Sequence, residues 1–199
     1  MLKTSFGHGA ALVAALAVLT GPVLAQGQQV QVIIDRGLTD DLPYTAIYPN
    51  VMRSVDDNNS ETILTIQHPD ALMQCDFFSV AGAPDGWSAD AALASLDAAG
   101  IEAAWTPNFP GFKLGGQSVG SFASGPSLFY EGQADSSPMG PAVNVVHAEA
   151  VDSGRTYIVE CLVDSSVAAE ARPMIDFIIA NFSTRSDGQC CINPLDDRG

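Results

Sequence analysis

The sequence predicts an α+β domain in which two helices cover an antiparallel sheet. Two strand-like runs separated by Pro69-Asp70 predict a strand pair, and four further runs between residues 113 and 163 predict an antiparallel meander. One stretch with helical spacing of apolar residues precedes the meander and another follows it, so both are expected to cover the sheet. A chain of this size normally forms one domain with a substantial core.

Seven runs predict strands because they are rich in β-branched and aromatic residues or alternate between apolar and polar positions. Ser124-Gly125-Pro126 and Asp152-Ser153-Gly154 are turn-forming breaks between neighbouring runs, and a longer loop of Ser, Pro and Gly divides the middle pair. The expected strands are residues 29–35, 61–68, 73–80, 117–123, 127–134, 142–151 and 155–163.

Two segments predict helices. Ser88 offers an N-cap hydroxyl to an alanine-rich stretch, and Gly100 stands where a left-handed C-cap is favoured, so a first helix is expected over residues 88–100. Residues 166–182 place apolar side chains on one face and form the second expected helix, with Pro173 at the first turn of its apolar half or at a kink.

The remaining segments divide the chain into four parts. Residues 37–59 carry two prolines and the run Asp56-Asp57-Asn58-Asn59, which favour turns, so a loop is expected there. The polar tail contains Cys190-Cys191 and is expected to be extended unless a disulfide holds it. The expected parts are a cleaved signal peptide (1–25), an N-terminal strand with an acidic loop (26–60), an α+β core domain (61–183) and a C-terminal tail (184–199).

The first 25 residues have the pattern of a cleaved signal peptide. Lys3 precedes an apolar run over residues 10–19, and small residues precede Gln26. The run is shorter than the ~20 residues that span a bilayer, and Gly21-Pro22 interrupts it. We therefore expect export to the periplasm and no stable membrane insertion after cleavage. Removing the first 25 of 199 residues leaves 174.

The chain is strongly acidic. Its 23 Asp and Glu residues and 8 Lys and Arg residues give a formal net charge of −15, which becomes −16 when Lys3 leaves with the signal peptide. Phosphate backbones and anionic lipids are repelled by this charge, so no nucleic-acid partner is expected. The same charge favours solubility and basic partners.

Four cysteines remain after export, and an oxidising compartment favours disulfides over free thiols. Cys75 and Cys161 each lie in an expected strand and could be cross-strand neighbours, which would leave Cys190 and Cys191 to bond to each other. In the alternative pairing, each tail cysteine bonds to one strand cysteine. A thiol-redox role for the tail pair is a further hypothesis, although the chain lacks a Cys-x-x-Cys motif and the nearest base is Arg185.

The order of the expected elements resembles the PsbP/Mog1-like α/β/α sandwich proteins. The residues that carry the resemblance are Gly115-Gly116, Tyr130, Tyr157-Ile158-Val159 and Phe177-Ile178-Ile179-Ala180-Asn181-Phe182-Ser183. The resemblance covers residues 61–183, and neither the cysteines nor the Asp/Asn loop belong to it. It implies a small accessory protein that binds a larger partner without chemistry of its own.

A Gly-x-Ser-x-Gly sequence around Ser118 is the main catalytic candidate. In hydrolases this serine lies on a tight turn from a strand to a helix. His147 follows Ser118 with Asp135 between them, so the chain order permits a triad, and a small serine hydrolase is the alternative function. A strand and a turn, rather than a helix, are expected after Gly120, which disfavours the triad.

A possible calcium loop is incomplete. Asp56, Asn58 and Ser60 resemble its start, but Glu61 replaces its glycine and Gln67 replaces its final glutamate.

The second possible metal site involves His147. His147 and Glu149 lie on the same face of one expected strand, and a tight turn would bring His147 opposite a residue near Glu160 on the next strand. A zinc or copper site needs three or four converging ligands, whereas a surface cross-strand pair needs two. We therefore interpret these residues as a surface pair and expect neither a metal nor a cofactor.

Four aromatic residues lie in or beside Pro- and Gly-containing loops around the first expected helix. Exposed aromatics in such positions often serve recognition; the other interpretation is a satellite cluster that seals one end of the sandwich. The candidate binding residues are Trp87, Trp105, Phe109 and Phe112. The leading interpretation is an exported, non-enzymatic accessory or binding protein whose partner is a protein or a small molecule.

Overall fold

The computed structural model describes residues 31–37, 42–56, 60–138 and 140–188. The expected signal peptide, Cys190 and Cys191 lie outside these residues, and so do positions 57–59 of the possible calcium loop.

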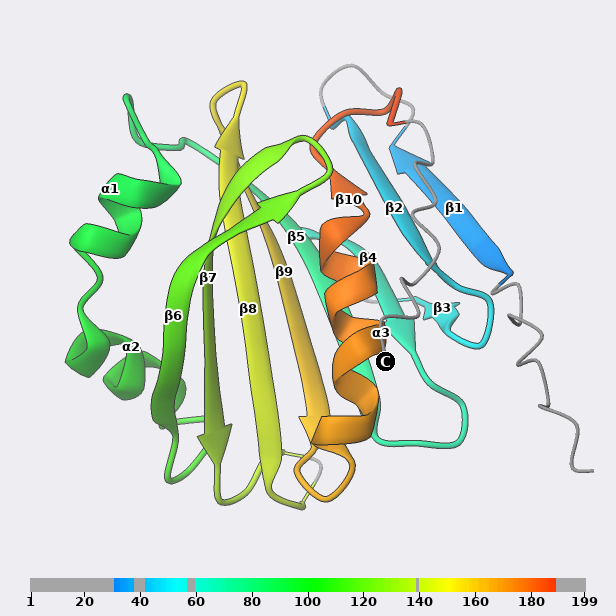
Figure 1. The fold of residues 1–199 in the computed structure, drawn as a ribbon, viewed down its shortest axis with the longest axis vertical. Coiled ribbons are helices and arrows are strands. Elements are labelled where there is room, and N and C mark those ends of the chain that lie inside the picture. Colours follow the sequence, from blue (N-terminus) through cyan, green and yellow to red (C-terminus); the bar gives the residue numbers. More distant parts are fainter. Residues whose placement is uncertain (1–30, 38–41, 57–59, 139, 189–199) are drawn as a thin grey trace, which may run out of the picture.

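A seven-stranded antiparallel sheet forms the centre of the fold (Figure 1), with the strand order β3-β4-β5-β9-β8-β7-β6. A second sheet of three strands has the order β1-β2-β10. The strands are β1 Val32–Gly37, β2 Tyr44–Pro49, β3 Arg53–Val55, β4 Thr62–Gln67, β5 Met73–Ala81, β6 Lys113–Phe122, β7 Gly125–Ala134, β8 Val143–Asp152, β9 Arg155–Asp164 and β10 Phe182–Ser183. The helices are α1 Ala89–Ala94, α2 Ala98–Trp105 and α3 Ala168–Ala180.

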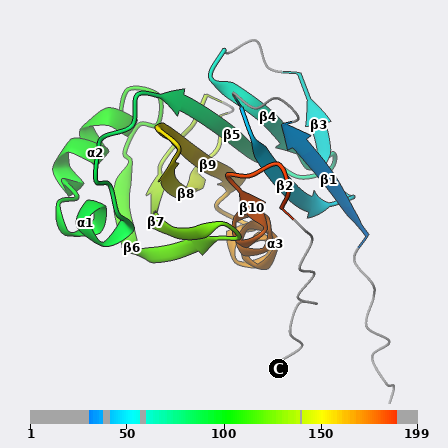
Figure 2. The same cartoon turned by 90° about the horizontal axis from the view of Figure 1, so that it is seen from above.

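Helices cover both faces of the large sheet. Figure 2 shows α1 and α2 together at one side of the molecule, beside β6, while α3 lies at another side with β10 and β2. The alternation of side chains along the strands explains this arrangement, because successive residues of a strand point to opposite faces. On β8, Val146, Ala148 and Ala150 pack in the core with α3, whereas Val143 and Val145 pack with residues of α2.

The strand pair and the four-stranded meander predicted from the sequence are confirmed. β4 pairs with β5, and β6, β7, β8 and β9 pair in succession, all antiparallel. The turn between β8 and β9 is tight, since Asp152 pairs directly with Arg155, and both Ser153 and Gly154 have positive φ as this kind of hairpin requires. β5 also pairs with β9, which joins the strand pair and the meander into one sheet.

The expected loop over residues 37–59 is partly wrong, because it contains β2 and β3. Every residue of β2 is buried, and β2 lies between β1 and β10. A strand that is buried on both faces has no alternation of apolar and polar residues, so its main sequence signal was absent. The first strand also differs from residues 29–35, since β1 spans Val32–Gly37.

The first expected helix is two helices. α1 ends at Ala94, where the hydroxyl of Ser95 donates a hydrogen bond to the carbonyl of Ala91. Ser88 is the N-cap of α1 as predicted, whereas Gly100 lies inside α2 rather than at a helix end. A hydroxyl that bonds to the preceding turn competes with continuation of the helix, which accounts for the break.

The last helix is shorter than predicted. α3 spans Ala168–Ala180 and contains Pro173, and Phe182 belongs to β10 instead. Among the described residues, no helix is long and apolar enough to cross a membrane.

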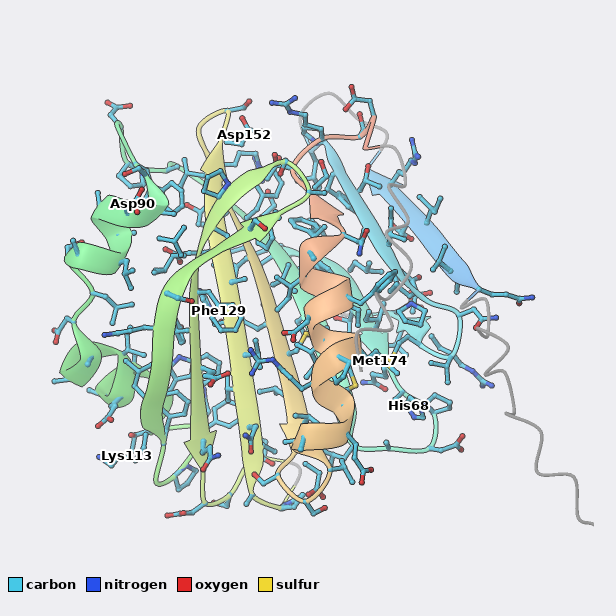
Figure 3. The ribbon with its side chains drawn as sticks, viewed as in Figure 1. His68, Asp90, Lys113, Phe129, Asp152 and Met174 are labelled. Atoms are coloured by element: carbon cyan, nitrogen blue, oxygen red, sulfur yellow. A yellow bond between two sulfur atoms is a disulfide. The ribbon has the colours of Figure 1, made fainter. Side chains whose placement is uncertain are left out.

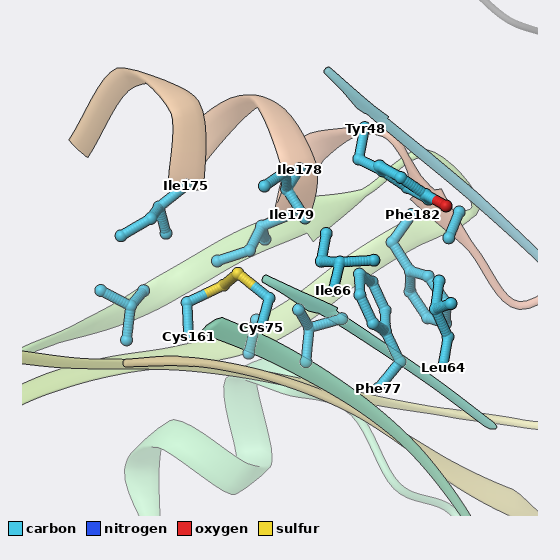
Figure 4. Packing of buried hydrophobic residues seen from close by; sticks show 14 of the residues in the cluster. Tyr48, Leu64, Ile66, Cys75, Phe77, Cys161, Ile175, Ile178, Ile179 and Phe182 are labelled. Atoms are coloured by element: carbon cyan, nitrogen blue, oxygen red, sulfur yellow. A yellow bond between two sulfur atoms is a disulfide. The ribbon is translucent and has the colours of Figure 1, made fainter. Parts of the chain in front are cut away.

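The main core lies between the large sheet, α3 and the second sheet. Cys75 of β5 lies directly opposite Cys161 of β9, and the two form a disulfide that is wholly buried. Figure 4 shows this disulfide beneath Ile175 and Ile179 of α3. The cross-strand pairing considered from the sequence is therefore correct, and the alternative in which the tail cysteines bond to the strand cysteines is excluded.

Candidate functional site

A groove of about 600 Å³ separates α1 and α2 from the large sheet. Its floor is formed by Tyr130 of β7 and by His147 and Glu149 of β8. Most of its walls are apolar, and the residues that form them include Trp87, Ala91, Ala92, Leu96, Ile101 and Leu128. An apolar groove with a few converging polar groups is the usual form of a ligand site.

His147 lies between two carboxylates on the floor of the groove. Its Nδ1 is 3.0 Å from a carboxylate oxygen of Glu160, and its Nε2 is 3.4 Å from one of Glu149. The prediction that His147 faces Glu160 is confirmed by their direct pairing across β8 and β9. The expectation of a surface pair is wrong for the histidine, because His147 is only 4% exposed.

The charge of His147 follows from these contacts. Burial lowers the pKa of His147, but the hydrogen bonds to Glu149 and Glu160 and their negative charges outweigh burial and raise its pKa above the ordinary value. An imidazole can donate from both nitrogens only when it is protonated. The geometry therefore favours an imidazolium that donates to two carboxylates.

Tyr130 connects this polar group to the aromatic residues. Its ring stacks on the His147 ring with centroids 4.2 Å apart and planes 10° apart. The indole N–H of Trp105 donates to the Tyr130 hydroxyl at 3.2 Å. Burial raises the pKa of Tyr130, so the phenol is neutral at physiological pH.

Three of the four candidate binding aromatics lie together. Trp105 stacks on Phe112 and also contacts Phe109, and the three form a small hydrophobic cluster with strand residues of β7 and β8. Phe112 is 1% exposed, so it supports the cluster from within and offers no surface to a partner. The structure thus corrects the expectation of exposure for Phe112, while Trp105 and Phe109 are half-buried.

Trp87 is separate from this cluster. It precedes α1, packs partly against the main core, and lines both the groove and a smaller pocket of about 360 Å³ beside the turn between β6 and β7. Trp87 and Trp105 therefore stand at the two ends of the α1–α2 segment. A role of Trp87, Trp105 and Phe109 in binding stays a prediction.

Glu102 fastens α2 to the edge of the sheet. Its carboxylate accepts hydrogen bonds from the Lys113 ammonium at 2.9 Å and from the Leu114 backbone N–H at 3.1 Å. These two contacts lower the pKa of Glu102. Together with the Trp105–Tyr130 hydrogen bond, they position the wall of the groove that lies toward β6.

The groove has an acidic character. Asp97 and Glu149 line it, and among the described residues of its lining none is a lysine or an arginine. Asp97 stands at the N-cap position of α2, where its side chain makes no capping hydrogen bond. Its carboxylate is therefore not committed to holding the helix.

Ser118 and His147 lie on opposite faces of the sheet. Ser118 pairs with Phe129, whose ring lies on the face toward α3, whereas His147 pairs with Tyr130 and faces the groove. Ser118 also lies in the middle of β6 and not on a turn from a strand to a helix. The two residues are not brought together, and the partners of His147 are Glu149 and Glu160 rather than Asp135.

A larger groove of about 810 Å³ lies on the other face, between the sheet and α3. Arg172 of α3 lies over the Phe129 ring, which Figure 3 labels, and is paired with Glu131 and Asp176. Arg172 is held by Glu131 and Asp176 and fastens α3 to the sheet, so its guanidinium is already paired and is not free to bind a ligand. Among the described residues, no group of three or more His, Cys, Asp or Glu side chains could hold a metal ion.

The sequence did not reveal that Tyr130 belongs to this site. Tyr130 and His147 lie in different expected strands, and the loop between them is long enough that the turn does not fix which residues pair. The small wall residues of α1 and α2 were also missed, because alanines in a helix carry no signal of binding. A tyrosine on the same face as a buried histidine is visible only once the register is known.

Comparisons with known proteins identify similar folds but no related sequence. No protein-family model matches the chain, and no curated protein matches it. The cyanobacterial PsbP of Synechocystis is similar in structure, with a TM-score of 0.54 and 11% identity over 82% of this chain and 99% of that one. The Ran-binding protein Mog1p of Saccharomyces cerevisiae has a TM-score of 0.52 and 7% identity, over 78% of this chain and 96% of that one.

A third similar structure, from Bacteroides thetaiotaomicron, has a TM-score of 0.50 and 12% identity, over 81% of this chain and 50% of that one. Identities this low show the fold alone. The fold is PsbP/Mog1-like, as the order of the elements in the sequence predicted.

Proposed function

We propose that this protein is an exported, non-enzymatic accessory or binding protein of the periplasm, and that it holds its partner in the groove between the α1–α2 segment and the sheet. The groove is the observation that carries the proposal. It combines apolar walls with a polar floor at Tyr130, His147 and Glu149, and it is open to solvent along the two helices.

The fold supports a binding role by analogy. Mog1p, one of the similar structures, is described as a Ran-binding protein, which places one binding protein on this fold. A fold hosts many functions, so the analogy supports the class of function and not the identity of a partner. The separation of Ser118 from His147 across the sheet supports a non-enzymatic role over a serine hydrolase.

Export is supported by two independent features. The first 25 residues have the pattern of a signal peptide, and Cys75 and Cys161 form a buried disulfide. Stable disulfides are typical of proteins that fold in oxidising compartments, because cytosolic thiols are kept reduced.

The test is a capture experiment with the full chain expressed in its own host. We expect the protein in the periplasmic fraction to begin at Gln26, and we expect the immobilised wild type to retain a specific partner from periplasmic extract. Trp105→Ala should lose that partner. Trp105→Phe, which keeps an aromatic ring in the cluster, serves as the control for folding. A chain that stays in the cytoplasm would refute the proposal. A partner that Trp105→Ala retains as well as the wild type does would also refute it.

A further inference from the structure

The groove pairs an acidic floor with aliphatic walls, and this combination selects one kind of ligand. We infer that it takes the cationic side chains of a lysine- or arginine-bearing segment of a partner protein, with the aliphatic stems against the walls and the charged ends at Glu149 and Asp97. The inference rests on the proposed function and specifies the chemistry of its partner.

His147 and its two carboxylate partners carry a net negative charge, and of these two carboxylates only that of Glu149 lines the groove. His147 supplies one positive charge as an imidazolium and faces two carboxylates, those of Glu149 and Glu160. One negative charge therefore remains, and Asp97 adds another at the rim. The Glu149 side chain is 25% exposed, and its contact to His147 is the longer of the two at 3.4 Å, so its carboxylate is accessible to a cation from solution.

The walls fit the stem of a basic side chain. The short side chains of Ala91, Ala92 and Ala104 leave space on the helix side of the groove. Leu96, Ile101 and Leu128 supply branched aliphatic surface. Lysine and arginine bury their methylene stems along apolar surface while the charged end reaches a polar group. An anionic ligand would be repelled by Glu149 and Asp97, and a purely apolar one would remove water from the Glu149 carboxylate and leave it only its 3.4 Å contact to His147.

An open groove suits a protein segment better than a small molecule. The groove runs along the outer face of the sheet beneath α1 and α2 and is not enclosed, so a free amine would bury little of its surface there. The formal net charge of −15 would also draw a basic protein toward this chain and raise the rate of encounter.

Two pairs of variants distinguish binding in the groove from a general attraction to the acidic surface. Asp97→Asn with Glu149→Gln removes the two carboxylate charges that line the groove, and Glu170→Gln removes a charge from the exposed first turn of α3 as its control. Ala91→Trp fills the groove without changing charge, and Ala94→Trp places the same bulk on an exposed position of α1 outside the lining. Thermal melting of each full-length variant checks that it is folded.

The probe is a fluorescent peptide of alternating lysine and alanine, titrated at low salt, with a matched peptide that carries glutamine in place of lysine. We expect the lysine peptide alone to bind. The Asp97→Asn/Glu149→Gln variant should bind the lysine peptide roughly tenfold or more weakly, because losing a hydrogen bond to a charged group reduces affinity by about this factor. Ala91→Trp should weaken it similarly, while Glu170→Gln and Ala94→Trp should leave it unchanged.

Three results would overturn the inference. The lysine peptide could fail to bind, Glu170→Gln could weaken it as much as the groove variants do, or butylamine could displace it at the concentration of the peptide itself, which would indicate a site for small amines. If capture from extract still depends on Trp105 in any of these cases, the proposed function stands and only the inference fails. If that capture also fails, both are wrong.

Discussion

The imidazole of His147 links the groove to the interior of the sheet. It stacks on Tyr130, contacts Glu149 at the floor, and is hydrogen-bonded to Glu160 of β9. Its pKa is raised because those contacts outweigh burial. The folded state therefore holds the proton more tightly than the unfolded chain does, and the stability of the protein depends on pH.

This dependence has a definite sign. The stabilisation by His147 is complete below its ordinary pKa of about 6.5 and is lost as the pH rises through the raised folded-state pKa. We expect His147→Gln to lower the free energy of unfolding by about 1–3 kcal/mol near pH 6, and by less as the pH rises. Urea unfolding at several pH values above about 5.5 measures the difference. His68→Gln, which replaces the half-buried histidine beside β4, is the control, and a His147→Gln effect that grows with pH would contradict the account.

Gly132 tests the packing of the aromatic cluster. A Cβ at this position would lie 2.6 Å from Phe112 Cε2 and 2.8 Å from the Lys113 carbonyl oxygen. Phe112 is buried and cannot move aside, so Gly132→Ala should lower the free energy of unfolding by about 2 kcal/mol. Gly120→Ala is the matched control, because its nearest contact is 3.3 Å from Phe129 Cβ. Chemical denaturation that finds equal losses for both variants would show that the cluster is not tightly packed.

The helices on the two faces of the sheet bury very different numbers of apolar side chains. α3 buries Ile175, Phe177, Ile178 and Ile179, whereas none of the eight described residues of α2 is fully buried. α2 is fastened by polar contacts at Glu102 and Trp105 instead. Few buried apolar contacts allow a segment to open at low free energy, so the α1–α2 wall can adjust to a ligand.

Hydrogen exchange should reveal this difference. We expect backbone amides of α1 and α2 to be protected at least about tenfold less than those of α3, because the helices over the groove open locally. Mass spectrometry of exchanged peptides from the full chain measures both segments in one sample. Equal protection of α2 and α3 would mean that the wall of the groove is as rigid as the core.

The elements that could be predicted are those with local signals. The meander strands alternate and are divided by Ser, Gly and Pro turns, and all four are present. β2 was not predicted because all of its residues are buried, and this burial depends on its pairing with β1 and β10. The stacking of Tyr130 on His147 depends on the register between β7 and β8, which no local signal fixes.

In the described part of the chain, a disulfide links the two strand units of the large sheet. Cys75 lies on the strand pair and Cys161 on the meander, and the disulfide joins them across a sequence separation of 86. α3 then packs over the disulfide, and β10 connects α3 to the second sheet (Figure 4). The disulfide therefore constrains the unfolded chain over nearly the whole sheet.

Removing the disulfide should be costly. The chain-entropy model gives a loss of about 4–5 kcal/mol for a loop of this length, so Cys75→Ala with Cys161→Ala should unfold at a much lower urea concentration. Cys190→Ala with Cys191→Ala is the control and should leave the Cys75–Cys161 bond and its contribution intact. An unchanged unfolding midpoint in the first double variant would contradict this view of the core.

The most direct measurement is site-specific photocrosslinking in cells that export the full chain. A photoreactive phenylalanine analogue at Ala91 lies in the wall of the groove, and the same group at Glu170 lies on the exposed surface of α3. We predict that the Ala91 position yields one discrete cross-linked partner in the periplasmic fraction and that the Glu170 position does not. The same products from both positions, or none from Ala91, would contradict the conclusion that this groove binds a partner.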